Sequence, residues 1–371
     1  MRVLYDYQAF SMQRYGGVSR YVASVVSAIR ASGEDVTAEF AGGYANNEFL
    51  AALGEPQPRT LLHRRQGRGA GTLQAAADLL NARLVERRID AGGIDVAHPT
   101  YYHTVPRERA AGPAVVLTVH DMIHELFDLP DGERVRALKR SAVERSDRIV
   151  AVSEHTAHDL RELLGVPAEK IAVIPHGRTF LGTEQGDESL ATPERFVLYV
   201  GSRTGYKNFA RLAEALAPLM ADDPALALVC AGGGPLNADE TALADRFGLT
   251  GRIVSAPADD ASLVTLYRRA TLFCCPSRYE GFGLPLLEAM SLGCPAVASD
   301  ASSLPEVGGD AVRYVDPESA GSMTAVIDEL LGDEGARRSL TEAGLARASR
   351  FSWEASAAAH IALYRAASSA S

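Results

Sequence analysis

The sequence predicts an α/β protein with two Rossmann-like domains, each a doubly wound parallel sheet covered by helices on both faces. Short apolar runs rich in Val, Ile and Leu alternate with helix-length amphipathic stretches along nearly the whole chain. Such continuous apolar runs are typical of parallel strands that are buried on both faces. The length of 371 residues exceeds what one hydrophobic core usually supports, so two domains are expected.

The expected strands follow the apolar runs, and the expected helices follow a different periodicity. In residues 18–32, for example, apolar side chains recur every 3.6 residues, which is the repeat of an amphipathic helix. The strands expected in the first half are residues 3–5, 36–40, 94–98, 115–119, 149–152 and 171–174. Those expected in the second half are residues 196–200, 226–231, 252–254, 272–275, 296–298 and 312–315. The other expected helices are residues 72–90, 133–146, 154–164, 209–220, 261–270, 285–292 and 353–366.

The boundary between the domains is expected at residues 179–192. This stretch is polar, contains Gly and Ser, and shows no periodicity, as is usual for a linker. It separates an N-terminal domain over residues 1–178 from a C-terminal domain over residues 193–350.

Composition argues against several classes of protein. The formal net charge of −10 disfavours a nucleic-acid-binding protein that relies on a positive field. The chain shows no signal peptide and no apolar run of membrane-spanning length. The four cysteines form no CxxC pattern and do not cluster with histidines, so buried reduced thiols are expected rather than a zinc site. Together these features predict a cytoplasmic protein.

Clustered arginines in the N-terminal domain form a candidate contact for anionic partners. The region from Arg59 to Arg68, together with Arg83, Arg87 and Arg88, suits the inner face of a membrane or a lipid-linked diphosphate acceptor. A solvated loop and helix face is the competing interpretation.

A loop with two glutamates and two glycines follows the expected strand 272–275 and leads into a helix. Gly281 and Gly283 let a ligand approach the backbone closely, and the N-terminus of a helix offers N–H groups to a diphosphate. Glu280 and Glu288 lie on either side of this turn, so both carboxylates can point at one ligand. The alternative is a tight turn followed by a helix with ordinary surface glutamates.

Three further positions suit a ligand with phosphate and sugar groups. Arg203 and Lys207 lie in the loop after the first strand of the C-terminal domain, and both cations bind phosphate well. Gly16 and Gly17 precede the first long helix, where a ligand can also come near the backbone. His120 ends the strand 115–119, at the sheet edge where such folds bind ligands. Solvated cations and a structural histidine are the alternatives.

Together these elements resemble the GT-B glycosyltransferases, and within them the retaining enzymes of family 4. The resemblance covers essentially the whole chain, and its most specific part is the segment from Glu280 to Glu288 with residues 293–299 after it. It implies two nucleotide-binding-type domains that face a cleft, and a last helix, 353–366, that crosses back to the first domain. Residues 5–8, 16–21 and 205–209 resemble the mannosyltransferases of O-antigen and polysaccharide assembly.

The resemblance also implies how the C-terminal domain binds its donor. Arg203 and Lys207 would hold the diphosphate, and Glu288 would bind the ribose hydroxyls. Glu280 would hold the transferred sugar together with backbone amides of Gly281, Phe282, Gly283 and Leu284.

In the N-terminal domain, the resemblance implies that Gly16 and Gly17 let the domain close on the phosphates. His120 would contact the donor sugar or the acceptor hydroxyl. The residues expected to act in catalysis are therefore His120, Arg203, Lys207 and Glu280. Two positions depart from the family pattern. Residues 255–257 stand where the family often has Gly near the donor base, and His176 stands where it usually has Asn.

The sequence contains no Asp-x-Asp pair, the motif with which many sugar transferases bind a metal ion. Fixed cations and a helix N-terminus would then stabilise the leaving diphosphate, so neither a metal nor another cofactor is expected. GDP-mannose is the favoured donor, and the acceptor is expected to be a glycan, a lipid-linked molecule or a small molecule. A sugar-nucleotide epimerase of the same architecture and a catalytically silent nucleotide-sugar-binding protein are the alternatives.

Overall fold

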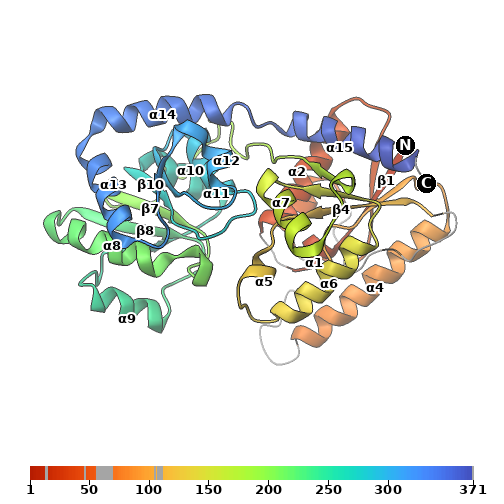
Figure 1. Ribbon diagram of the computed structural model, residues 1–371, viewed down its shortest axis with the longest axis horizontal. Helices are drawn as coiled ribbons and strands as arrows, with labels where there is room; N and C mark the ends of the chain where they lie inside the picture. The colour runs from red at the N-terminus through yellow and green to blue at the C-terminus, as the bar shows by residue number, and fades with distance from the viewer. Residues whose placement is uncertain (13–15, 46, 56–69, 104–105, 107–111, 370–371) are drawn as a thin grey trace. The chain divides into compact units, whose positions relative to one another are not determined.

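The computed structural model describes residues 1–12, 16–45, 47–55, 70–103, 106 and 112–369, and for residues 70–75 only the backbone. The chain divides into two compact units, whose course along the sequence is coloured in Figure 1. Unit 1 comprises Met1–Gly177 with Ser352–Ser371, and unit 2 comprises Arg178–Phe351. Within these described ranges, no helix is long and apolar enough to cross a lipid bilayer.

Unit 1 is built on six parallel strands in the order β2-β1-β3-β4-β5-β6. The strands are β1 (Arg2–Asp6), β2 (Thr37–Ala41), β3 (Val96–His98), β4 (Ala114–Val119), β5 (Arg148–Ala151) and β6 (Ile171–Val173). The helices are α1 (Gln8–Met12), α2 (Gly17–Ala31), α3 (Glu48–Ala52), α4 (Ala70–Asp90), α5 (Ile123–Leu126), α6 (Gly132–Glu144), α7 (Glu154–Leu164) and α15 (Trp353–Ser368). Every strand expected in this half is confirmed, although the ends of some differ by one or two residues.

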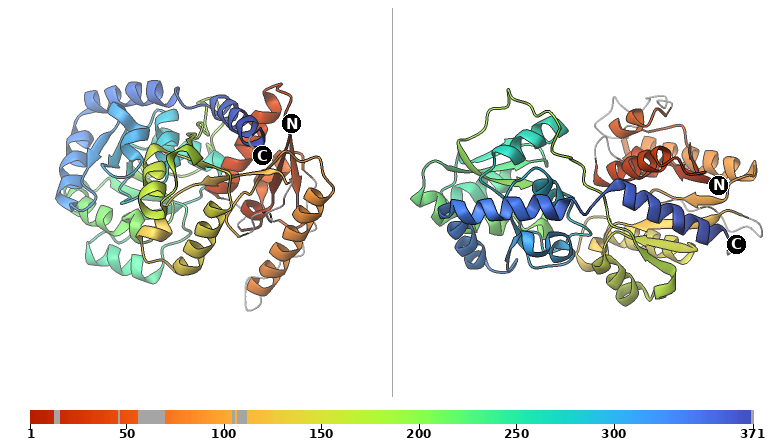
Figure 2. Two further views of the ribbon diagram at one scale, coloured as in Figure 1. Left: turned by 45° about the vertical axis from the view of Figure 1, so that its right-hand side comes forward. Right: turned by 90° about the horizontal axis from the view of Figure 1, so that it is seen from above.

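Helix α15 completes the core of unit 1 and lies beside α2 (Figures 1 and 2). Its side chains Ala357, Ile361 and Tyr364 are buried in one cluster with Val22 and Val26 of α2. The apolar stripe expected along α2 therefore packs partly against a helix from the far end of the chain. This packing makes the last residues of the sequence a structural part of unit 1.

Buried hydrogen bonds fix α15 in addition to apolar contacts. Tyr364 Oη lies 2.7 Å from Nδ1 of His98 in β3, and Tyr21 Oη of α2 lies 2.9 Å from Nε2 of His360. Nδ1 of His360 lies 2.8 Å from the carbonyl oxygen of Ser356, which can only accept, so Nδ1 carries the proton. A neutral His360 must then accept at Nε2, and Tyr21 is the donor. The direction of the buried hydrogen bond between α2 and α15 is therefore defined, from Tyr21 to His360.

Unit 2 is a second sheet of six parallel strands, in the order β12-β11-β10-β7-β8-β9. The strands are β7 (Arg195–Val200), β8 (Leu226–Ala231), β9 (Ile253–Ala256), β10 (Leu272–Cys275), β11 (Ala296–Ser299) and β12 (Arg313–Val315). The helices are α8 (Phe209–Asp222), α9 (Ala238–Arg246), α10 (Asp260–Arg269), α11 (Leu284–Ser291), α12 (Leu304–Gly308), α13 (Ala320–Gly332) and α14 (Glu334–Ala348). The strands expected here are also confirmed, and the doubly wound α/β class is correct for both units.

Residues 179–192, for which the sequence predicts a linker, are held against α10. Thr265 Oγ1 donates to the carbonyl oxygen of Asp187 at 3.0 Å, and the Arg268 guanidinium donates to that of Glu184 at 2.9 Å. The stretch belongs to unit 2 as a bound surface segment.

The strand order of unit 2 determines where a ligand can bind. From β7 the chain adds β8 and β9 on one side and then returns to place β10 on the other side of β7. The connections that leave β7 and β10 therefore run in opposite directions. In open α/β sheets this arrangement creates a crevice at the carboxyl ends of the two strands, where ligands bind. The loops at these two strand ends carry Lys207 and Glu280.

Candidate functional site

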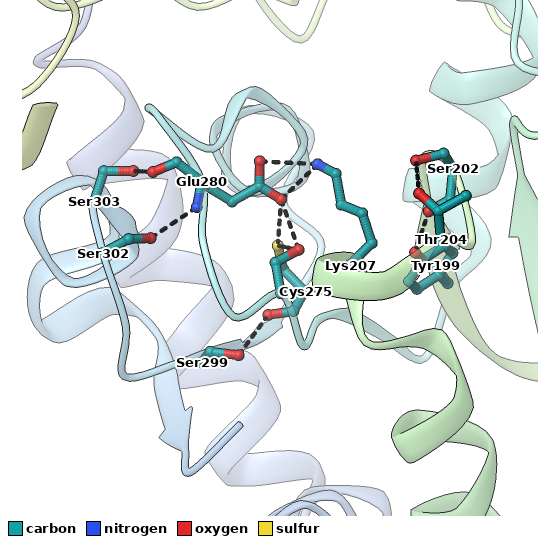
Figure 3. A network of polar contacts seen from close by, with 10 residues as sticks. Tyr199, Ser202, Thr204, Lys207, Cys275, Glu280, Ser299, Ser302 and Ser303 are labelled. Carbon is teal, nitrogen blue, oxygen red and sulfur yellow. Dashed lines mark hydrogen bonds and ion pairs between the residues drawn. The ribbon is translucent and has the colours of Figure 1, made fainter. Parts of the chain in front are cut away.

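Lys207 and Glu280 form an ion pair at the carboxyl edge of the sheet of unit 2 (Figure 3). Nζ of Lys207 lies 2.7 Å from Oε1 and 2.9 Å from Oε2 of Glu280. Burial by itself would lower the pKa of Lys207, but the Glu280 carboxylate, together with Tyr206 and Cys275, outweighs burial and raises the pKa above its ordinary value. The lysine is therefore a permanent cation at this edge.

Three serines hold Glu280 in place, and none of them is predicted as a site residue from the sequence; Ser302 and Ser303 are labelled in Figure 3. Ser277 Oγ donates to Oε1 of Glu280 at 2.6 Å. The backbone N–H of Glu280 donates to Ser302 Oγ, and Ser303 Oγ donates to the carbonyl oxygen of Glu280, each at 2.8 Å. Because both the backbone and the carboxylate are bound, the orientation of Glu280 is fixed before any ligand arrives.

Asn208 joins three of the loops at this edge. Its φ of 62° lies in the left-handed region, which Asn tolerates better than most other residues. Its side-chain Nδ2 donates to the carbonyl oxygens of Pro276, after β10, and Pro317, after β12, at 3.0 and 2.7 Å. The amide thus fixes the position of Lys207, its neighbour in the sequence, relative to the loop that bears Glu280.

Arg203 follows β7, and its side chain contacts the glycine-rich loop that follows β8. Its guanidinium donates to the carbonyl oxygens of four consecutive residues, 232–235, over 2.8 to 3.3 Å. Nε of Arg203 lies 3.0 Å from Oε1 of Glu240, and the arginine side chain is only 1 % exposed. The sequence predicts a diphosphate ligand at this position, and in the structure loop and helix groups bind the guanidinium. Contact of Arg203 with a phosphate stays a prediction.

Helix α11 begins without a side-chain cap, at Gly283. The φ of Gly283 is 94°, and a Cβ atom there would come within 2.8 Å of Leu304 Cδ2, so glycine is required. The N–H groups of the first turn of a helix have no partner within the helix and attract anions.

One turn on, Glu288 is buried, and its Oε2 accepts a hydrogen bond from Tyr267 at 3.2 Å. Phe282, before the turn, is also buried.

The remaining predicted residues lie at the carboxyl edge of the sheet of unit 1. Helix α2 begins at Gly17, after the extended Gly16, and it too has no side-chain cap. His120 follows β4, and among the described residues its buried Nε2 has no hydrogen-bond partner. Burial lowers the pKa of His120 to about 4, so its imidazole is neutral at pH 7.

His120 also lines a pocket at this edge, together with aromatic and polar side chains. Tyr21 packs against His120 edge to face, with ring centroids 4.9 Å apart and an interplanar angle of 86°. The other residues that line the pocket are Tyr5, Val22, Val25, His98, Pro99, Thr100 and Thr118. The pocket measures about 10 Å³, room for one water-sized group, so a neutral imidazole with an unused ring nitrogen there suits a single neutral polar group such as a hydroxyl.

Comparison with known proteins decides the family. Residues 15–178 match the model of Glycosyltransferase Family 4, and residues 183–347 match that of Glycosyl transferases group 1. O-antigen chain mannosyltransferase B from Escherichia coli is 34% identical over 274 residues, which are 69% of this chain and 70% of that protein. The chain belongs to glycosyltransferase family 4.

A second relative of this glycosyltransferase is D-inositol 3-phosphate glycosyltransferase from Segniliparus rotundus. It is 33% identical over 276 residues, which cover 69% of the chain but only 62% of that protein. Among solved structures, sucrose-phosphate synthase from Thermosynechococcus elongatus superposes with a TM-score of 0.76 at 20% identity, covering 100% of this chain and 99% of the other. At that identity the likeness shows a shared fold, which confirms the GT-B architecture expected from the sequence.

Membership of this family shows that the protein is a hexosyltransferase, which uses a sugar donor and an acceptor. The two alternatives, a sugar-nucleotide epimerase and a catalytically silent binding protein, are therefore not favoured. In the described part of the glycosyltransferase, no three or more His, Cys, Asp or Glu side chains are grouped so as to hold a metal ion. The structure brings Lys207, Glu280 and the start of α11 to one edge of unit 2. The basic region from Arg59 to Arg68 lies outside the described residues.

Proposed function

We propose that this glycosyltransferase moves mannose from GDP-mannose to a glycan, lipid-linked or small-molecule acceptor, with retention of anomeric configuration. The observation that carries the proposal is the Lys207–Glu280 pair, fixed beside the uncapped start of α11 where the strand order of unit 2 reverses. A nucleotide-diphosphate sugar needs a cation and N–H donors for its phosphates and a carboxylate for its hydroxyls. All three lie at one edge, so we assign donor binding to unit 2 and acceptor binding to unit 1.

The leaving diphosphate gains negative charge as the bond between sugar and phosphate breaks. Lys207 carries three N–H donors, so it can bind a phosphate oxygen while it remains paired with Glu280. The start of α11 at Gly283 and Leu284 adds a partial positive charge. In this proposal these fixed charges do the work of a metal ion. In this proposal Arg203 also binds the diphosphate, and its bonds to the carbonyl oxygens of residues 232–235 hold the guanidinium in place.

The carboxylates and the histidine act on the sugar and the ribose. Glu280 accepts hydrogen bonds from hydroxyls of the transferred sugar, and Glu288 accepts those of the ribose. His120 binds a hydroxyl of the sugar or the acceptor through its unused Nε2, and the backbone at Gly16 and Gly17 binds an anionic donor group. In a front-side reaction the acceptor oxygen bonds to the anomeric carbon on the face that the diphosphate leaves, and a phosphate oxygen takes the acceptor proton.

The donor is tested by thermal unfolding of the purified protein with a panel of nucleotide sugars. GDP-mannose at a hundred times its Kd is expected to stabilise the folded state by about 2.7 kcal/mol, a shift of several degrees in Tm. GDP and UDP-glucose serve as comparisons for the sugar and for the base. Stabilisation by a UDP-sugar but not by GDP-mannose would contradict the donor assignment and leave the family assignment intact.

We also propose that the outer face of α4 contacts an anionic membrane surface. Leu79 and Leu80 are 65% and 39% exposed, and Arg83 and Arg87 are exposed one and two turns further on. Apolar side chains flanked by arginines are typical of helices that lie at a lipid interface.

In co-sedimentation, vesicles with phosphatidylglycerol should bind the protein and those of phosphatidylcholine alone should not. Leu79→Glu should abolish binding and Arg350→Glu, an exposed position in unit 2, should not, whereas equal binding by both variants would contradict the proposal.

A further inference from the structure

The turn that carries His120 is held by a lysine from a different helix. After β4 the chain passes through His120, Asp121 and Met122 into α5. Lys139 of α6 reaches this turn, and its Nζ donates to the carbonyl oxygen of Asp121 at 2.9 Å. Nζ also lies 3.9 Å from Oδ1 of the same aspartate. The lysine therefore binds the residue that directly follows the histidine.

The burial of Lys139 is complete, which is unusual for a lysine. Its side chain is 0% exposed, and its carboxylate partner Glu125, at 2.6 Å, is 8% exposed. Burying such a pair costs several kcal/mol per ion, and the attraction between the two charges repays this only when the geometry is good. A well-packed apolar pair would serve stability as well or better. Because the buried charge is not needed for stability, we infer that it has another role.

A second contact connects Lys139 to the backbone of His120. Nζ of Lys139 lies 5.5 Å from the centroid of the Tyr102 ring, within the range of a cation–π interaction. Tyr102 Oη in turn accepts a hydrogen bond from the backbone N–H of His120 at 3.4 Å. The lysine thus supports the histidine from both sides, through Asp121 and through Tyr102.

We propose that Lys139 is a positioning residue for His120 and fixes the turn that carries the imidazole. As a buried cation it also opposes protonation of the ring. The inference rests on the proposed function, in which His120 binds a hydroxyl group. A neutral imidazole can accept or donate at Nε2, whereas imidazolium can only donate. Keeping His120 neutral preserves its ability to accept a hydrogen bond from a sugar or acceptor hydroxyl.

The titratable groups around His120 come from several elements, and they differ in their effect. Burial is the largest cause of the lowered pKa of His120; the Asp121 carboxylate raises this pKa, and the Lys139 cation lowers it. His98 and His176 also lie close enough for charge on His120 to lower their own pKa values, and like charges oppose one another. Among the described residues, the phenols of Tyr21 and Tyr102 are also neighbours and Tyr5 lines the same pocket; all three are uncharged at pH 7.

The variant that tests the inference removes both buried charges together. Lys139→Met alone leaves the Glu125 carboxylate buried and unpaired, which would destabilise the fold strongly. Lys139→Met combined with Glu125→Gln avoids that charge and is expected to fold. Lys170→Met is the matched control, because Lys170 also donates to backbone carbonyls, those of Val143 and Glu144, but lies on a different loop.

The decisive measurement is the NMR titration of the His120 ring, which does not depend on activity. In the double variant the pKa of His120 is expected to rise by about one unit, a tenfold change in proton affinity, because a nearby cation is lost while Asp121 remains. In a plot of kcat against pH, the acid limb should move to higher pH by the same amount. Donor KM should change less than twofold and kcat should fall about tenfold. An unchanged titration of His120, equal to that of Lys170→Met, would overturn the inference.

A separate variant distinguishes this inference from the proposed function. Full activity of His120→Ala would remove the histidine from the reaction, but the titration of His120 in the Lys139→Met/Glu125→Gln protein would still report on the positioning. If His120→Ala is inactive and the titration does not move, the role of His120 stands and that of Lys139 fails.

Discussion

Replacing Lys207 by Ala is expected to lower kcat about 10²–10³-fold, roughly 3–4 kcal/mol, as when one fixed charge stabiliser is removed from a water-excluded site. The structure fixes the Lys207 cation at the edge of the unit 2 sheet where the strand order reverses. Its loss also leaves the Glu280 carboxylate without its partner. The effect should fall on kcat more than on KM, because the charge on the diphosphate grows as the bond breaks. Steady-state kinetics with varied donor measures both constants.

The control for this prediction is the metal dependence of the reaction. Transfer by the unmodified protein should persist in excess EDTA, because fixed charges stabilise the leaving group. Lys207→Arg should recover part of the activity, since the charge is kept while the geometry of the donors changes. Full activity of Lys207→Ala, or activity that EDTA abolishes and Mg²⁺ or Mn²⁺ restores, would exclude the proposed stabilisation.

Glu280→Ala is the second change with a large expected effect, about 10²-fold in kcat, because the carboxylate orients the sugar at the reacting centre. Glu288→Ala should instead raise donor KM roughly 10–100-fold, the range for a lost hydrogen bond to a charged group that serves the ribose in ground and transition states alike. Purely affinity-based losses of equal size for both variants would refute this division of roles.

The ion pair makes the effects of the two site residues dependent on each other. Lys207→Ala combined with Glu280→Ala should lose much less activity than the product of the two single losses, because each single variant also disables the partner. A double variant that shows the full product would mean that the two side chains act independently, in spite of the 2.7 Å contact.

Features that depend on local sequence pattern could be predicted well. The strands of both sheets are continuous apolar runs, and burial on both faces of a parallel sheet produces this pattern directly. A turn that leads into a helix could be proposed at Gly281 and Gly283, and the left-handed backbone of Gly283 is what the structure adds. Lys207 and Glu280 could be proposed as neighbours because both follow strands of one sheet.

Features that depend on contacts between distant residues could not be predicted. Arg203 donates to backbone carbonyls about thirty residues away, and no side-chain pattern in the sequence reveals these bonds. The bridging of Pro276 and Pro317 by Asn208 depends on where three loops end in space. Lys139 looks like one more charged residue of an amphipathic helix, and only the fold shows that it is buried.

The place of α15 in unit 1 has a consequence for how the protein is made. The ribosome synthesises residues 178–351 between the two parts of unit 1, so this unit lacks a helix until α15 has been made. Until then His98 and Tyr21 lack the partners that Tyr364 and His360 later supply, and the apolar face of α2 stays uncovered. Unit 2 is contiguous and can fold first, during translation. Unit 1 therefore completes its core only after all of unit 2 has been synthesised.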